Sequence, residues 1–211
     1  PYPNLDGVMN SCGLERVSGY ICEASNGAYY SSPTYIVPSV QYEPKLSSVT
    51  EGVAYVLSPV AHGIKPLDNF RGTLRHYPIL KTSDYSYAKQ DLMSTDTSFS
   101  VGDIEGPFCV GMAAVEKIGQ LESRVIWFSS SGMLDSKVDS VVSGTNTLLF
   151  LNSVNYLCGS EVPTLHAKAT STGTLPVMPK DKAVWSAIML AVVPGCTLAV
   201  GLIVCARRRR F

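Results

Sequence analysis

An uninterrupted apolar run followed by a cluster of arginines closes the chain. Residues 183–206 contain no Asp, Glu, Lys, Arg, His, Asn or Gln, and Arg207, Arg208, Arg209 and Arg210 follow directly. A helix of about 24 residues, at a rise of about 1.5 Å per residue, is long enough to cross a hydrocarbon core of about 30 Å. A core helix of a soluble domain usually keeps a polar face, which this run lacks. The sequence therefore predicts one transmembrane helix over 183–206.

Three residues in this run are typical of a membrane anchor in contact with lipid. Trp185 lies near the start, where an indole ring occupies the headgroup region of a bilayer. Pro194 and Gly195 lie in the middle, where a bilayer tolerates a helix break if neighbouring groups satisfy the released carbonyls. We expect the helix to kink there.

The arginine cluster predicts the topology. Short segments rich in Lys and Arg stay on the cytoplasmic side of a membrane, so Arg207 to Arg210 would be cytoplasmic and the preceding domain outside the cell. A cluster that adjoins an apolar span is more typical of topology or headgroup contact than of nucleic-acid binding, so no nucleic-acid partner is expected. The predicted organisation is an extracytoplasmic domain (1–161), a linker (162–182), a transmembrane helix (183–206) and a cytoplasmic tail (207–211).

The start of the chain suggests that something precedes it. Pro1 is not a methionine, and neither a signal peptide nor an earlier apolar span follows it. An outward domain needs an export signal, so we expect a cleaved signal or, preferably, a first membrane helix upstream. The domain is then expected to be truncated at its N-terminus.

Charge and cysteine content indicate an ordinary domain without a metal centre. The chain has 17 acidic and 17 basic residues, and four of the basic ones lie in the tail. Of the six cysteines, those outside the predicted span show neither a CxxC spacing nor a Cys/His cluster of metal type. A bridge between Cys12 and Cys22 is compatible with an oxidising exterior, but their apolar surroundings favour free thiols. No cofactor or metal is expected.

The hydrophobic periodicity predicts alternating helices and strands. A helical spacing from Asn4 ends at Gly13, and an amphipathic helix over 146–161 has a glycine stop signal at Gly159. Short apolar segments bounded by turn residues predict strands. These segments are 16–24, 52–59, 72–83, 107–116 and 123–131. Because their hydrophobicity is nearly continuous, we expect a parallel sheet between helix layers, hence a three-layer α/β domain.

A tyrosine-rich stretch separates the first predicted strand from the others. Residues 25–44, rich in Tyr, Ser and Pro, read as an irregular surface excursion. Its four tyrosines favour packing on the domain, while a binding platform, as in a surface receptor or adhesin, is the alternative.

The serine turn after the last predicted strand is the candidate ligand site. Ser129, Ser130 and Ser131 lie where α/β proteins form ligand sites, at the carboxyl end of a strand. No base can be assigned to them, because the three histidines lie in a loop, at a strand start and in the linker. A structural role for the serines is therefore favoured. The histidines are His62, His76 and His166.

Other catalytic motifs are missing from the sequence. Cys109 lacks the first glycine of a nucleophile elbow and lies where a strand begins rather than ends. The acidic residues of 84–105 fall in a polar stretch typical of turns. No Walker A or GxGxxG motif occurs. The sequence indicates a protein that is not an enzyme.

The ordered series of segments resembles the C-terminal portion of the GldG-like auxiliary proteins of ABC transporters, which include gliding-motility components and uncharacterised transport proteins of bacteria. The resemblance is carried by PNLDGVMNSCGLERVSGYICE, YIVPSV, EGVAYVLSPVAHGI, YPILKTSDYSYAK, GPFCVGMAAVE, SRVIWFSSSGML, LFLNSVNYLCGSE and AVWSAIMLAVVPGCTLAVGLIVCARRRR. It implies an extracytoplasmic domain with a flavodoxin-like or glutamine-amidotransferase-like fold. It also implies an ABC-2 type permease and a cytoplasmic ATPase as partners. The chain lacks the family's first helix and opening strand.

Two functions follow as expectations. The first is a non-enzymatic, membrane-anchored auxiliary subunit of an ABC-2 type transport system, which binds a partner or substrate on the outer face. The alternative is a membrane-tethered hydrolase or ligand-binding domain that uses the Ser129–Ser131 turn.

Overall fold

The computed structural model describes residues 3–68 and 70–159, and in the C-terminal region residues 186, 188–192, 194–196, 198, 201 and 208. The chain divides into two compact units, Pro1–Ala169 and Thr170–Phe211. The first unit contains the sheets, the hydrophobic core and the sites discussed below. In the second unit, η3 (Ile188–Val192) is a short π-helical turn.

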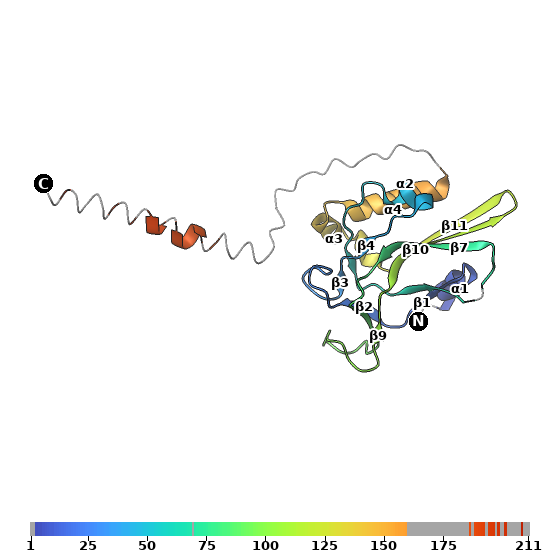
Figure 1. The fold of residues 1–211 in the computed structure, drawn as a ribbon, viewed down its shortest axis with the longest axis horizontal. Helices are drawn as coiled ribbons and strands as arrows, with labels where there is room; N and C mark the ends of the chain where they lie inside the picture. The colour runs from blue at the N-terminus through green and yellow to red at the C-terminus, as the bar shows by residue number, and fades with distance from the viewer. Residues whose placement is uncertain are drawn as a thin grey trace. The chain divides into compact units, whose positions relative to one another are not determined.

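The first unit consists of short strands and helices in the following order (Figure 1). The elements are α1 (Pro3–Ser11), β1 (Leu14–Arg16), β2 (Tyr20–Glu23), β3 (Tyr35–Ile36), β4 (Ser39–Val40), η1 (Pro44–Leu46), α2 (Ser47–Thr50), β5 (Ser58–Pro59), β6 (Ile64–Pro66), β7 (Leu74–Lys81), β8 (Ser86–Lys89), β9 (Ile104–Glu105), β10 (Cys109–Ile118), β11 (Leu121–Phe128), η2 (Ser131–Leu134), α3 (Ser136–Val141) and α4 (Thr145–Cys158).

The sheets are antiparallel wherever the structure describes a strand pair. The largest sheet has the order β1-β6-β10-β7-β4, with β11 also paired to β10. Two smaller sheets are β2-β8-β9 and β3-β5. The prediction of a flavodoxin-like or glutamine-amidotransferase-like domain with a parallel three-layer sheet is therefore wrong.

The physical reason for this error lies in β10. Its six residues Val110–Val115 are buried, which gives the near-continuous hydrophobicity that predicted a parallel strand. A central strand covered on both faces needs such residues whatever the direction of its neighbours, because burial and strand direction are independent. Here β7 and β11 are both antiparallel to β10.

Alternate residues of β10 contribute to two hydrophobic clusters. Ala113 belongs to the larger cluster, whereas Met112 and Ala114 belong to the smaller one. Since successive strand residues face opposite sides of a sheet, the clusters lie on its two faces. Val110 is on the same face as Ala113, and the register shift of β10 against β7 around Gly111 accounts for this odd spacing.

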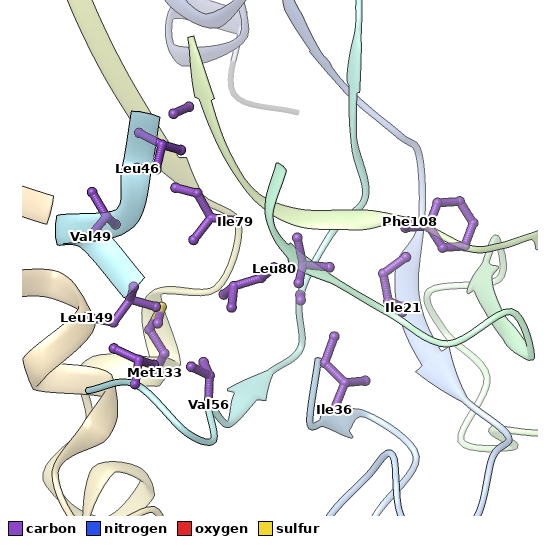
Figure 2. Packing of buried hydrophobic residues seen from close by; sticks show 14 of the residues in the cluster. Ile21, Ile36, Leu46, Val49, Val56, Ile79, Leu80, Phe108, Met133 and Leu149 are labelled. Carbon is purple, nitrogen blue, oxygen red and sulfur yellow. The ribbon is translucent and has the colours of Figure 1, made fainter. Parts of the chain in front are cut away.

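Helices cover both faces of the large sheet. Figure 1 shows α2 and α4 side by side over one face, and α1 next to β1. Figure 2 shows the larger cluster, in which Leu46 and Val49 from the η1–α2 segment and Leu149 from α4 converge with Ile79 of β7. On the opposite face, Met9 of α1 packs against the smaller cluster.

The segment predicted as a strand over 52–59 forms a strand only at Ser58–Pro59, and residues 53–57 have no regular secondary structure. The fully buried side chain of Asn146 on α4 takes the place of a strand partner. Its amide nitrogen donates to the carbonyl oxygens of Leu57 (2.9 Å) and Met133 (2.8 Å), and its amide oxygen accepts from the Leu57 N–H (3.1 Å). Asn152, which lies later on α4, donates to the carbonyl oxygens of Val49 and Glu51. Buried backbone groups require such partners, so α4 fixes this segment.

The C-terminal prediction is also corrected. Among the residues that the structure describes, no helix has both the length and the hydropathy needed to cross a membrane. This finding contradicts the predicted transmembrane helix over 183–206 and the membrane localisation and topology derived from it. Pro194 and Gly195 belong to a described helical turn and Arg208 is described as helical, whereas Trp185, Arg207, Arg209 and Arg210 lie outside the described residues.

Candidate functional site

The predicted serine turn connects β11 to η2, and its three hydroxyls have different surroundings. The Ser129 hydroxyl donates to the carbonyl oxygen of Val110 at 3.1 Å, and the Ser129 N–H donates to the same oxygen at 3.0 Å. The buried Ser130 donates its hydroxyl proton to the carbonyl oxygen of Pro59. The exposed Ser131 hydroxyl forms no hydrogen bond within the described part of the chain. Ser131 is therefore the serine of this turn that can bind a ligand without first breaking an internal bond.

His62 lies beside the serine turn, although 67 residues separate it from Ser129. Its backbone N–H donates to the Ser129 hydroxyl at 3.3 Å. Its ring Nδ1 is 2.5 Å from the carbonyl oxygen of Gly19, and because a carbonyl only accepts, Nδ1 carries the proton. In the neutral ring, the lone pair then resides on Nε2, which has no hydrogen-bond partner among the described residues.

Ser129, Ser131 and His62 line a cavity of about 550 Å³. Its walls come from α1, β1, the turn after β5, the end of β11 and the start of η2. The aromatic and aliphatic lining consists of Leu5, Pro59, Val60, Trp127 and Phe128, and the polar lining consists of Asp6, Arg16, His62, Ser129 and Ser131. A concave, partly apolar surface with a few convergent polar groups is typical of small-molecule sites, and this volume falls in their usual range of about 300–1,000 Å³.

An ion pair forms one wall of this cavity, which we call the serine-turn cavity. Arg16 on β1 and Asp6 on α1 approach within 2.9 Å, and their side chains are 23% and 29% exposed. The pair joins the helix to the sheet, since α1 has no fully buried residue of its own. It also adds a guanidinium group and a carboxylate to the cavity lining.

Val60, also in the lining, has an unusual backbone conformation. Its φ of +48° falls in the left-handed region, which is a genuine outlier for a β-branched residue. The bond from its N–H to the carbonyl oxygen of Thr34, at 2.9 Å, holds the turn in place. Backbone strain of this kind is concentrated at ligand and active sites.

The structure thus brings together residues that sequence reasoning treated separately. It places His62, predicted as a loop histidine, beside Ser129, but the contact is made by the His62 backbone N–H and its ring contacts no serine. No local pattern could have predicted this contact, because it depends on the pairing of β6 with the start of β10. Asp6, Arg16 and Trp127 were not expected at the site either.

The remaining candidates lie elsewhere or are otherwise engaged. Cys109 is the first residue of β10 and is half-buried, and desolvation raises the pKa of its thiol, although Lys81 opposes the shift. Within 3–68 and 70–159 and the shorter described stretches, no group of three or more His, Cys, Asp or Glu residues is arranged to hold a metal ion.

In comparisons with known proteins, no family model, no curated protein and no solved structure matches this chain.

Proposed function

We propose that this protein is a non-enzymatic binding domain whose ligand occupies the serine-turn cavity. The observation that carries the proposal is the convergence of the Ser131 hydroxyl and the His62 ring with Trp127 on one concave surface. The ligand is a small molecule, or a side chain of a partner, with an apolar body against Trp127 and a polar group that contacts Ser131 and His62.

The hydrogen bonds of the serines favour binding over catalysis. A nucleophilic serine must pass its proton to a base. The Ser129 and Ser130 protons are instead donated to backbone carbonyls, which are not bases. His62 approaches Ser129 through its backbone N–H and not through its ring.

The sequence resemblance extends this proposal to a biological setting. A binding domain of this kind fits an auxiliary subunit that accompanies an ABC-2 type permease and an ATPase, and such a subunit needs a ligand or partner site but no catalytic centre. The fold that the resemblance implied is not the observed one, so the support for this setting is the series of sequence segments alone. Copurification of the full chain with a permease and an ATPase from cells that produce all three supports the setting, and purification of the full chain without either subunit counts against it.

The binding site can be tested by the fluorescence of Trp127. The chain has two tryptophans, so a Trp185→Phe variant of the full chain leaves Trp127 as the reporter. We expect members of a panel of small aromatic acids, amides and alcohols to change its emission, because the indole lies in the cavity wall. The Ser131→Ala and His62→Ala substitutions should each weaken the affinity for the tightest-binding member of the panel by about tenfold. This is the effect of about one lost hydrogen bond in a desolvated site.

A matched serine provides the control. Ser48 on α2 is exposed and lines neither this cavity nor the second one described below, so Ser48→Ala should leave the affinity unchanged. An unchanged affinity in Ser131→Ala and His62→Ala contradicts the proposed site. Hydrolysis of p-nitrophenyl acetate that disappears in Ser131→Ala or Ser129→Ala would instead establish the hydrolase alternative.

A further inference from the structure

A second depression lies on a different part of the first unit and shares no lining residue with the serine-turn cavity. It has a volume of about 750 Å³. Residues of three stretches of chain line it: 25–28, 37–42 and, within 50–55, Thr50, Val53, Ala54 and Tyr55. The first two belong to the tyrosine-rich excursion, and the third belongs to the segment that α4 fixes.

Hydrogen bonds and strand pairing fix the backbone of each of the three stretches. A turn closed by the Ala28 N–H and the Ser25 carbonyl oxygen, 3.1 Å apart, forms the first, with Gly27 at a φ of +96°. The second includes β4, whose two residues pair with Lys81 and Leu80 of β7. The lining is therefore organised before any ligand binds, which lowers the entropic cost of binding.

Two tyrosine rings stand out at this depression. Tyr42 is 78% exposed and Tyr55 is 70% exposed, yet the backbone on which each stands is anchored. The N–H of Gln41, next to Tyr42, donates to the carbonyl oxygen of Ile79 at 2.8 Å. The carbonyl oxygen of Tyr55 accepts from the Thr145 hydroxyl of α4. Large rings on a fixed backbone offer contact area at a low cost in conformational entropy.

Unpartnered amide and hydroxyl groups accompany the two rings. The Gln41 side-chain nitrogen donates to the Ser39 hydroxyl at 2.8 Å, and the Ser39 hydroxyl donates to the Lys81 carbonyl oxygen. This chain of bonds fixes the Gln41 amide and leaves its Oε1 as a free acceptor among the described residues. The side chains of Asn26 and Thr50 likewise form no hydrogen bond within the described part of the chain.

Among the described residues, the lining carries no Asp, Glu, Lys, Arg or His side chain. The serine-turn cavity, in contrast, is lined by Asp6, Arg16 and His62. A charged ligand would find no ion partner in the second depression, and a purely apolar ligand would leave the amides and hydroxyls unpaired at a cost in free energy. The ligand that fits has no charge, many hydroxyl groups and at least one apolar face.

We propose that this depression binds a neutral oligosaccharide. A pyranose ring presents a face of C–H groups that stacks on an aromatic ring, and a rim of hydroxyls that both donate and accept hydrogen bonds. Tyr42 and Tyr55 supply the aromatic faces, and Gln41 supplies a fixed amide acceptor. The volume of about 750 Å³ lies within the usual range of about 300–1,000 Å³ for small-ligand sites.

The composition of the lining also resembles that of antibody paratopes, in which Tyr, Ser, Gly and Asn are enriched. Two observations favour the oligosaccharide over a protein. The surface is hollow, and of the three residue types that dominate the binding energy of most protein interfaces, Trp, Tyr and Arg, the described lining carries only Tyr.

The proposal can be tested on the full 211-residue chain with maltotriose, cellotriose and tri-N-acetylchitotriose as probes. Saturation-transfer-difference NMR at about 5 mM of each sugar detects dissociation constants in the millimolar range. We expect transfer to the C–H protons of at least one sugar. Tyr42→Ala and Tyr55→Ala should each weaken binding by about tenfold or more, whereas Tyr42→Phe and Tyr55→Phe keep the stacking ring and should retain most of it.

Two controls separate this site from other surfaces. Tyr85 is 73% exposed and lines neither depression, so Tyr85→Ala should bind normally. Ser131→Ala should also bind normally, so that failure of the serine-turn proposal and failure of this one are distinguishable. The proposal is overturned if no sugar shows transfer, or if binding persists at full strength in Tyr42→Ala and Tyr55→Ala.

Discussion

Val60 shows, at the scale of a single residue, how the fold imposes a conformation that the side chain disfavours. Its side chain is 54% exposed, so burial gives little compensation for the left-handed φ of +48°. Ser31 and Ser143 also have a positive φ, but neither is β-branched. The conformation of Val60 is therefore locally unfavourable in free energy, and the surrounding hydrogen bonds, such as that from the Val60 N–H to Thr34, maintain it.

A substitution at this residue should relieve the strain. Asn adopts the left-handed region several times more readily than a β-branched residue, so Val60→Asn should raise the free energy of unfolding by about 1 kcal/mol. Urea denaturation followed by circular dichroism measures the change. Val101, which is fully exposed and has an ordinary φ, provides the control, and Val101→Asn should give no gain. A loss of stability in Val60→Asn would contradict this account.

At the scale of an element, the 53–57 segment and α4 form one unit. The segment forms no strand ladder before Ser58, so its buried backbone groups depend on the amide of Asn146. The Oδ1 atom of Asn152, which is also buried on α4, has no hydrogen-bond partner in the part of the chain that the structure describes. Its NH₂ group nevertheless supplies two bonds to the end of α2.

Removal of the Asn146 side chain should destabilise the protein severely. Asn146→Ala leaves the buried N–H and carbonyl of Leu57 and the carbonyl of Met133 unpaired. Each such group costs about 1–3 kcal/mol, so a total loss of about 3 kcal/mol or more is expected. Asn155 lies on the same helix with no side-chain bond in the described region. Asn155→Ala should change the free energy of unfolding by less than about 0.5 kcal/mol. Equal effects of the two substitutions in urea denaturation would refute the role of Asn146.

At the scale of the whole molecule, buried acidic groups predict how stability depends on pH. Desolvation is the largest influence on the thiol of Cys22 and the phenol of Tyr87, and it raises the pKa of Cys22 from 9.0 to about 11 and that of Tyr87 from 10.0 to about 12. Lys89 opposes the shift at Cys22, and Asp103 adds to both shifts. Desolvation also raises the pKa values of Tyr20, Cys109 and Tyr156.

These shifts should make the protein sensitive to alkali. A pKa that folding raises contributes stability that is complete below the unfolded value and is lost as the pH rises through the folded value. The free energy of unfolding should therefore be steady from about pH 6 to about pH 9 and fall between about pH 9 and pH 12. Urea denaturation at a series of pH values measures this. In Cys22→Ala the decline should be shallower, and a decline of unchanged slope would show that Cys22 does not contribute.

The helix at 146–161 and the strands at 72–83, 107–116 and 123–131 were predictable because their signals are local. Apolar periodicity and the glycine stop at Gly159, which has a φ of +63°, correspond to α4. β7, β10 and β11 likewise lie where short apolar runs are bounded by turn residues.

Strand direction, the contact of His62 with Ser129 and the two cavities could not be predicted in this way. Each depends on segments far apart in the chain, and a pattern of hydrophobicity records whether a residue is buried but not which neighbour buries it. The amino-acid sequence by itself determined where the main helices and strands form, because backbone preference and burial act over a few residues. Only the tertiary structure decided that the sheets are antiparallel and that a serine turn meets a histidine, because long-range packing brings these groups together.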